Sequence, residues 1–219
     1  MHGLSNFVSG PLAWVAFILF LGGIIYRLIT RIAMVNKSDY VVTEYFSLYY
    51  GLRSILHWII PFANRNSRER PIMTIVTFAF HICLFVAPIF LLAHVILIDQ
   101  AWGIDWWTLP ESVTDIMTLV VLAGCVYFAW RRLTQPEVKF VTSASDYVIL
   151  IIVAAPFLTG FLAYHQWLGY KFWLILHILA GEVMLVAIPF TRLAHMIYAP
   201  FMRAYMGSEL GAVRHVKDY

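Results

Sequence analysis

The histidines are the residues of this sequence whose type and spacing point most directly to chemistry. His177 and His195 lie 18 residues apart in the apolar stretch 172–200. On one continuous helix both rings would leave the same face, separated along the axis by about 27 Å. That separation is close to the thickness of the hydrocarbon core of a bilayer. Imidazole is a good ligand for iron, and an ionisable group inside a membrane is a functional hypothesis by default.

A second pair of histidines lies in the apolar stretch 72–98. His81 and His94 are 13 residues apart, which on an ideal helix places them about 220° apart around the axis. Pro88 lies between them. Because a proline kinks or locally unwinds a helix, the angle between the two rings can be reset there.

The composition determines the class of protein that must position these rings. The chain has 219 residues, of which 62% are hydrophobic and only 12% charged, whereas a soluble domain carries about 25% charged residues. We therefore expect an all-α integral membrane protein with one membrane-embedded domain over 1–219 and the lipid bilayer as its surroundings. The net charge of +3 does not indicate nucleic-acid binding, because the basic residues cluster where cytoplasmic loops would lie.

Five apolar runs are long enough to cross a membrane, since a spanning helix needs about 20 apolar residues. Basic residues follow the first and third runs, precede the second and fill the C-terminal tail, so the positive-inside rule places the N-terminus outside and the C-terminus in the cytoplasm. Residues 46–62 predict a cytoplasmic amphipathic helix at the interface or against a partner subunit, with a re-entrant segment as the alternative. The predicted spans are 11–34, 72–98, 113–133, 146–168 and 172–199.

This topology pairs the four histidines by depth. The second and fifth spans run antiparallel, so His94 lies near the outer surface, level with His177. His81 lies deeper and is the partner available to His195. Two antiparallel helices that carry two histidines each can clamp two stacked b-type haems through bis-histidine ligation.

Other polar residues in or near the spans have two interpretations each. Glu182 either relays a proton from an oxidised quinol or is a neutral acid hydrogen-bonded to the backbone or another helix, because burying an ionised carboxylate is costly. Arg192 either pairs with a haem propionate or anchors the chain near the cytoplasmic surface. We expect His57 and His165 at the two interfaces, where their rings would extend toward the headgroups.

Several stretches of the sequence resemble a known family. LHILAGEVMLVAIPFTRLAHMIYAPF, with its 18-residue histidine spacing, resembles the last helix of the gamma subunit of respiratory nitrate reductase, a dihaem cytochrome b. RRLTQPEVKFVTSASDYVILIIVAAPFLTGFL (131–162) and FHICLF around His81 are also similar, so the resemblance covers about 72–203. The 40–70 segment looks more like the gamma-type subunits of the Hmc, Tmc and Dsr complexes of sulfate-reducing microbes. Those subunits work beside a cytoplasmic iron–sulfur protein similar to heterodisulfide reductase.

The resemblance implies two non-covalent haem b groups, an outer one ligated by His94 and His177 and an inner one ligated by His81 and His195. It implies a multi-pass electron-transfer subunit of a respiratory redox complex in a prokaryotic cytoplasmic membrane. Electrons would pass between menaquinone, or a periplasmic multihaem cytochrome c, and the iron–sulfur subunit, with further membrane subunits alongside. Menaquinol would bind beside the outer haem, near the loop 99–107.

Two hypotheses of other classes compete with this one. The chain could be a haem-free anchor that tethers the iron–sulfur partner, or a small transporter that uses its histidines for proton coupling. The match of four histidines by depth favours haem ligation over the anchor, and the sequence lacks the duplicated halves expected of many transporters.

Overall fold

The computed structural model describes residues 2–38, 44–167 and 169–216, and within these ranges the regular elements are helices without strands. Five of the described helices are long and apolar enough to cross a membrane, which confirms the expected all-helical, multi-pass class. They cover Gly3–Val35, Pro71–Phe90, Glu111–Thr134, Ala144–Tyr164 and Tyr170–Phe190. The chain contacts define two compact units, which we describe in turn: 1–9 with 76–184, and 10–75 with 185–219.

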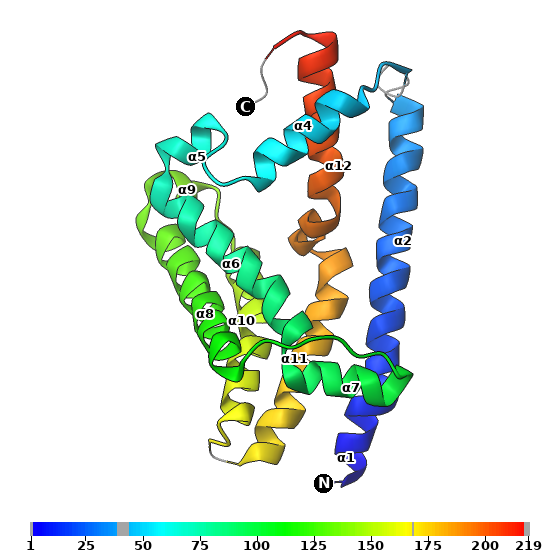
Figure 1. Ribbon diagram of the computed structural model, residues 1–219, viewed down its shortest axis with the longest axis vertical. Coiled ribbons are helices and arrows are strands. Elements are labelled where there is room, and N and C mark those ends of the chain that lie inside the picture. The colour runs from blue at the N-terminus through cyan, green and yellow to red at the C-terminus, as the bar shows by residue number, and fades with distance from the viewer. Residues whose placement is uncertain (1, 39–43, 168, 217–219) are drawn as a thin grey trace. The chain divides into compact units, whose positions relative to one another are not determined.

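The first unit is built on a group of apolar helices, of which α8 and α10 pack as neighbours joined by the short α9 (Figure 1). Phe80 meets Phe128 edge-on with ring centroids 5.2 Å apart, and Gly124 leaves the room that this contact needs. A capping box starts α10, because the Ser143 backbone N–H donates to the Asp146 carboxylate at 2.8 Å. The elements are α1 (His2–Phe7), α6 from residue 76 (whole helix Pro71–Phe90), α7 (Leu92–Trp102), α8 (Glu111–Thr134), α9 (Pro136–Phe140), α10 (Ala144–Tyr164) and α11 (Tyr170–Phe190) through residue 184.

The second unit contains the long α2 (Ala13–Ser38) and a crossed pair, α4 (Leu48–Ile59) and α12 (His195–Ser208) (Figure 1). A Cβ atom on Gly207 of α12 would come within 2.3 Å of the Cβ of Ser54, so the crossing requires a residue without a side chain there. The outward face of α4 exposes Leu48, Leu52 and Leu56. The amphipathic helix predicted over 46–62 is therefore confirmed, although it starts later, at Leu48, and ends earlier, at Ile59. Its place at a membrane surface stays a prediction. The remaining elements are α5 (Arg65–Glu69), η2 (Arg192–Ala194) and η3 (Glu209–Val213), with η1 (Val8–Leu12) leading into α2.

Two of the predicted spans are interrupted. The second predicted span breaks shortly after Pro88, where the sequence predicts a kink or local unwinding, whereas the prediction that the fifth span is one continuous helix is wrong. The helix α6 ends at Phe90, and Leu91 adopts an extended backbone (φ −72°, ψ 127°) before α7 leaves in another direction (Figure 1). Likewise α11 ends at Phe190, Thr191 is extended, and the 3-10 turn η2 leads into α12. Apolar residues run through the first interruption, so hydropathy gives no sign of it, whereas the second contains Thr191 and the charged Arg192.

The other predicted spans agree with the structure to within a few residues. The span predicted over 113–133 is α8, and the one predicted over 11–34 lies within the described apolar helix Gly3–Val35. The fourth predicted span, 146–168, corresponds to α10, which ends at Tyr164; Leu168 lies outside the described residues.

Candidate functional site

The four histidines singled out by the sequence share one hydrogen-bonding pattern. In each of them Nδ1 lies 2.7–2.8 Å from a backbone carbonyl oxygen. Since a carbonyl only accepts, Nδ1 carries the hydrogen and the lone pair is on Nε2. Metal-bound histidines have this arrangement, because the bond from the other ring nitrogen fixes the tautomer and the ring orientation. The pairs are His81 with Thr77, His94 with Pro88, His177 with Pro156 and His195 with Arg192.

The structure brings the rings of His94 and His177 together in the first unit. Their centroids are 5.9 Å apart and their planes differ by only 16°. Two imidazoles bound on opposite sides of one metal, with metal–nitrogen bonds of about 2 Å, have centroids on the order of 6 Å apart. The spacing of this pair fits bis-histidine ligation of an iron, and ligation itself stays a prediction.

The end of α6 explains the position of His94. An α-helix ends with four carbonyls that have no donor within the helix, so each needs another partner. In α6 each of these four carbonyls has a hydrogen-bond donor. The imidazole of His94, which lies beyond the interruption, donates to the carbonyl of Pro88. The four bonds are Leu91 N to Ala87 O (3.0 Å), His94 Nδ1 to Pro88 O (2.8 Å), Trp106 Nε1 to Ile89 O (2.9 Å) and Leu109 N to Phe90 O (3.0 Å).

The position of His177 depends on a neighbouring helix. Its Nδ1 donates to the carbonyl of Pro156 in α10 at 2.8 Å. One turn further along α10, a Cβ atom on Gly160 would lie only 2.9 Å from both Nδ1 and Cε1 of the imidazole. Gly160 is therefore needed for the ring to rest against α10.

His195 lies in the second unit, at the first residue of α12. The 18-residue spacing from His177 therefore does not run along one helix, and the prediction that both rings leave one face of a continuous helix is wrong. Thr191 explains the turn that replaces the helix: its hydroxyl donates to the carbonyl of Ala187 at 2.7 Å and accepts from the N–H of Leu193 at 3.2 Å. A threonine in this role stops one helix and starts the next.

His81 lies inside the uninterrupted part of α6, and its Nδ1 donates to Thr77 O, one turn earlier. Phe80 and the ring of His81 meet edge-on at 5.2 Å. His81 belongs to the first unit and His195 to the second. Their pairing as inner ligands stays a prediction.

Glu182 is buried in α11, with 8% of its surface exposed. Both carboxyl oxygens are buried, and neither has a hydrogen-bond partner among the described residues. The hydrogen bond to the backbone or another helix, expected if Glu182 is a neutral structural acid, is absent among the described residues. A carboxyl group in such a place is stable only when neutral or when a partner arrives, which leaves the proton-relay hypothesis standing.

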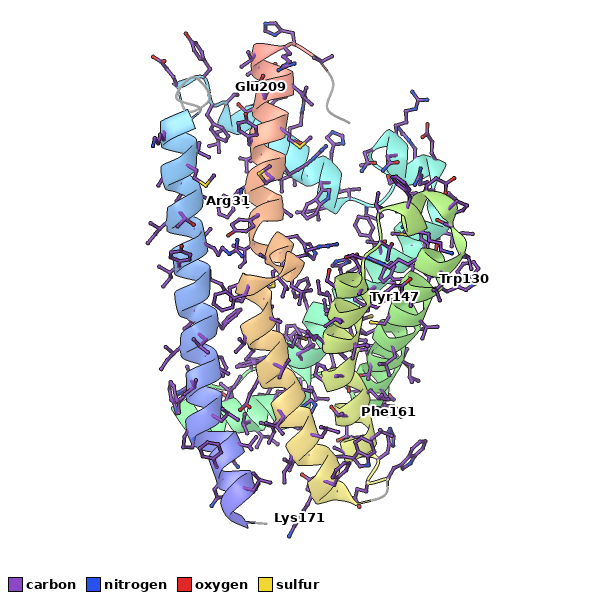
Figure 2. The ribbon with its side chains drawn as sticks, turned by 180° about the vertical axis from the view of Figure 1, so that it is seen from behind. Arg31, Trp130, Tyr147, Phe161, Lys171 and Glu209 are labelled. Atoms are coloured by element: carbon purple, nitrogen blue, oxygen red, sulfur yellow. The ribbon has the colours of Figure 1, made fainter. Side chains whose placement is uncertain are left out.

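The histidines expected at the interfaces differ from the other four. The His165 ring uses Nε2 instead, 3.3 Å from the carboxylate of Asp115, and it lies against Phe161 with centroids 4.3 Å apart (Figure 2 labels Phe161). His57 is in the last turn of α4. Neither shows the Nδ1-to-carbonyl bond seen in the four candidate ligands.

Sequence reasoning missed several residues that position the site. The indole N–H of Trp106 donates to the carbonyl of Ile89 and completes the end of α6. Gly160 and Thr191 set the places of His177 and of the turn before His195, and Arg27 donates from α2 to Pro189 O at 2.9 Å. A proline one to three residues before each interruption was the available signal, in Pro88 and Pro189.

The described residues contain no cluster of three or more His, Cys, Asp or Glu side chains that could hold a metal ion. A haem needs only two axial ligands from the protein, because the porphyrin supplies the other four.

These features define a helical protein with five helices long and apolar enough to cross a membrane and with the rings of His94 and His177 close together. The chain belongs to the same family as a protein of Nitratidesulfovibrio vulgaris strain Hildenborough. The two are 33% identical over 212 residues, which cover 95% of this chain and 94% of the relative. That relative is described simply as "Protein", so its name states no activity. No family model matches the chain.

Proposed function

We propose that this chain is the dihaem cytochrome b subunit of a membrane-bound respiratory redox complex. The observation that carries the proposal is the pair His94 and His177, whose nearly parallel rings lie 5.9 Å apart with each Nδ1 bound to a carbonyl. Both Nε2 lone pairs are thereby available in the tautomer that ligates iron. His81 and His195 have the same tautomer and would hold the second haem.

The protein's contribution in this proposal is ligation and orientation. A haem, when bound, supplies one-electron redox chemistry. The carbonyls of Pro88 and Pro156 fix the rings of the outer pair, and the apolar surroundings exclude water. Arg192 would contact a propionate of the inner haem, and Glu182 would take up a proton released when menaquinol is oxidised near the outer pair.

The proposed partners follow from topology and resemblance. With the N-terminus outside and the C-terminus in the cytoplasm, the α4–α12 pair lies on the cytoplasmic side, where a heterodisulfide reductase-like iron–sulfur subunit would dock. Menaquinol or a periplasmic multihaem cytochrome c would exchange electrons on the other side, in the cytoplasmic membrane of a prokaryote. The source of the relative, a sulfate reducer, supports the likeness to the Hmc, Tmc and Dsr complexes.

A pyridine haemochrome assay with a reduced-minus-oxidised spectrum on the purified complex tests the proposal. We expect two b haems per chain, about one after any single His→Ala change in the set, and two in the control His165→Ala. Double variants test the pairing. His94→Ala with His177→Ala keeps one haem, whereas His94→Ala with His195→Ala loses both.

Two outcomes would contradict the proposal in different ways. Absence of b haem from the wild-type subunit leaves the haem-free anchor as the function. One haem in the His94 and His195 double variant, with none in the within-pair double, would show that the ligands pair differently. Size-exclusion profiles of each variant confirm that the complex is intact before haem is counted.

A further inference from the structure

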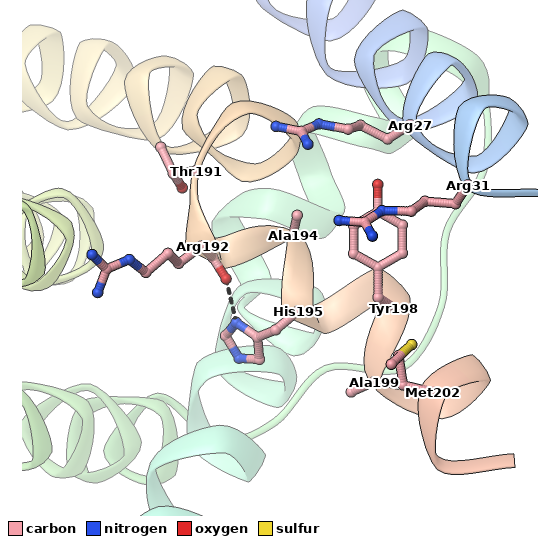
Figure 3. A pocket seen from close by; sticks show the side chains of 9 residues that line it. All are labelled: Arg27, Arg31, Thr191, Arg192, Ala194, His195, Tyr198, Ala199 and Met202. Atoms are coloured by element: carbon pink, nitrogen blue, oxygen red, sulfur yellow. Dashed lines mark hydrogen bonds between the residues drawn. The ribbon is translucent and has the colours of Figure 1, made fainter. Parts of the chain in front are cut away.

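A hollow of about 310 Å³ lies in the second unit where α11 gives way to α12, beside α2 (Figure 3). Three arginines and one histidine are among the residues that line it. Among the described residues that line it there is no carboxylate. The lining consists of Arg27, Arg31, Thr191, Arg192, Ala194, His195, Tyr198, Ala199 and Met202.

Two of these cations come from one helix. Arg27 and Arg31 are one turn apart on α2, and like charges at this spacing repel each other. Arg27 donates through Nε to the carbonyl of Pro189 at 2.9 Å, which uses one of the five donors of the guanidinium. Arg31 lies over the ring of Tyr198, 5.4 Å from the centroid, and extends from α2 toward α12 (Figure 2).

Tyr198 adds a hydroxyl group to the lining of the hollow. Its hydroxyl oxygen is buried and has no hydrogen-bond partner among the described residues. Figure 3 shows this hydroxyl directed toward Arg27 and Arg31. A buried hydroxyl without a partner is costly, and together with two guanidiniums it presents only positive charge and N–H or O–H donors. An oxyanion is the ligand that satisfies all three groups at once.

The surroundings distinguish between two sources of an oxyanion, a phospholipid headgroup and a haem propionate. In Figure 3 the side chains of Arg192 and His195 point away from Arg27, Arg31 and Tyr198. A haem held by His195 would therefore lie on the other side of the turn. The apolar side chains of α2 around the two arginines are well exposed, with Ile29 61% and Ile32 59% exposed, as suits a helix that faces lipid.

We propose that Arg27, Arg31 and Tyr198 form a binding site for the phosphate of an anionic phospholipid. The bidentate guanidinium is suited to phosphate, and basic pockets beside spanning helices bind acidic headgroups. The bound lipid would relieve the repulsion between the two arginines and seal α2 against the end of α11. This site does not depend on the presence of haem.

Native mass spectrometry of the purified complex, exchanged into detergent with added phosphatidylglycerol or phosphatidylcholine, tests the site. We expect wild-type complex to retain phosphatidylglycerol in preference to phosphatidylcholine. Arg27→Gln combined with Arg31→Gln lowers that retention about tenfold, and Tyr198→Phe lowers it by a few-fold, since each removes charged or hydroxyl donors. Lys37→Gln, which removes a cation from the same helix outside the hollow, leaves retention unchanged.

The haem count of the same samples separates the two sources of oxyanion. Unchanged haem in the double arginine variant, with lipid lost, supports the lipid site. Equal lipid retention in the double variant and in Lys37→Gln overturns it. Loss of haem with lipid retained also overturns it and assigns the arginines to a propionate. Displacement of the lipid by millimolar inorganic phosphate would show that free phosphate, rather than a headgroup, is the ligand.

Discussion

The two helix interruptions of this chain look alike in sequence and are held in different ways. Each comes shortly after a proline, and each is followed within four residues by a candidate ligand, His94 in one and His195 in the other. At the first interruption the partners of the helix-end carbonyls come from within 19 residues along the chain. At the second, a partner comes from Arg27, 162 residues away in sequence.

The role of the histidine differs accordingly. The imidazole of His94 bonds to the carbonyl of Pro88, six residues earlier, and so it holds the end of α6 in place. The imidazole of His195 bonds to the carbonyl of Arg192, three residues earlier and within the turn itself. His94 is thus part of the structure that positions it, whereas His195 is carried on a turn that other residues hold.

The largest effect should come from filling the contact between α2 and the end of α11. A Cβ atom on Gly23 would lie 2.7 Å from Cγ of Pro189 and 3.1 Å from Cζ of Phe190. Gly23→Ala should therefore destabilise the protein by about 1–3 kcal/mol, the usual cost of overpacking. Thermal unfolding in detergent, followed by circular dichroism, measures the change.

The adjacent glycine supplies the control. A Cβ atom on Gly22 meets nothing within 4 Å, so Gly22→Ala should be neutral or slightly stabilising, since alanine favours a helix more than glycine does. Equal destabilisation by the two substitutions would mean that α2 does not rest against Pro189.

A smaller effect should separate the two histidines in haem-free protein. His94→Phe leaves the carbonyl of Pro88 without its donor, which costs about 1–3 kcal/mol where the site is shielded from water. His195→Phe removes one of two donors from the carbonyl of Arg192, because the backbone N–H of residue 195 also donates to it and water can reach it, so the cost should be about 0.5 kcal/mol. Thermal midpoints of protein produced under haem limitation measure both.

This comparison depends on removing haem from the experiment. In the haem-loaded protein both substitutions would also remove an iron ligand under the proposed function, and the two losses would be alike. A larger destabilisation by His195→Phe in haem-free protein would contradict the assignment of a structural role to His94 alone.

The sequence was sufficient for the parts of this fold that follow from composition. Runs of about 20 apolar residues identified the five long helices, and a mixed apolar and polar pattern identified α4. The same apolar character concealed the interruption at Leu91, because hydropathy does not change there, whereas Thr191 is followed at once by the charged Arg192. What breaks these helices is the presence of donors for the end carbonyls, and those donors are brought in by tertiary contacts.

The candidate site was predictable to a similar extent. The structure places His94 beside His177 as the depth argument required, and the role of the four histidines as haem ligands stays a prediction. The supporting residues Gly160, Trp106 and Arg27 were not predictable, because each acts on a carbonyl or ring that is remote in sequence or lies across the fold. The one-face geometry failed since it assumed a continuous helix.

The smallest effect should come from Pro88→Ala, which asks what causes the first interruption. A proline ring clashes with the carbonyl four residues earlier, here that of Leu84, and so disturbs the turn before it. The interruption at Leu91 comes after Pro88. The substitution returns an N–H to the helix, worth about 0.5–1.5 kcal/mol, and loosens the unfolded chain by about 0.4–1 kcal/mol, so the net change in stability should be small.

The position of the interruption should not move, because the four end carbonyls of α6 keep their partners in the Pro88→Ala variant. Spin labels at Ile82→Cys and Leu97→Cys, both exposed positions, in a background with Cys83 and Cys125 replaced by alanine, report on this by electron paramagnetic resonance. A continuous helix would separate the labelled positions by roughly 22 Å along its axis, and the bent chain holds them closer. An unchanged distance in the variant assigns the interruption to its capping by His94 and Trp106, whereas a shift to the longer distance would assign it to the proline.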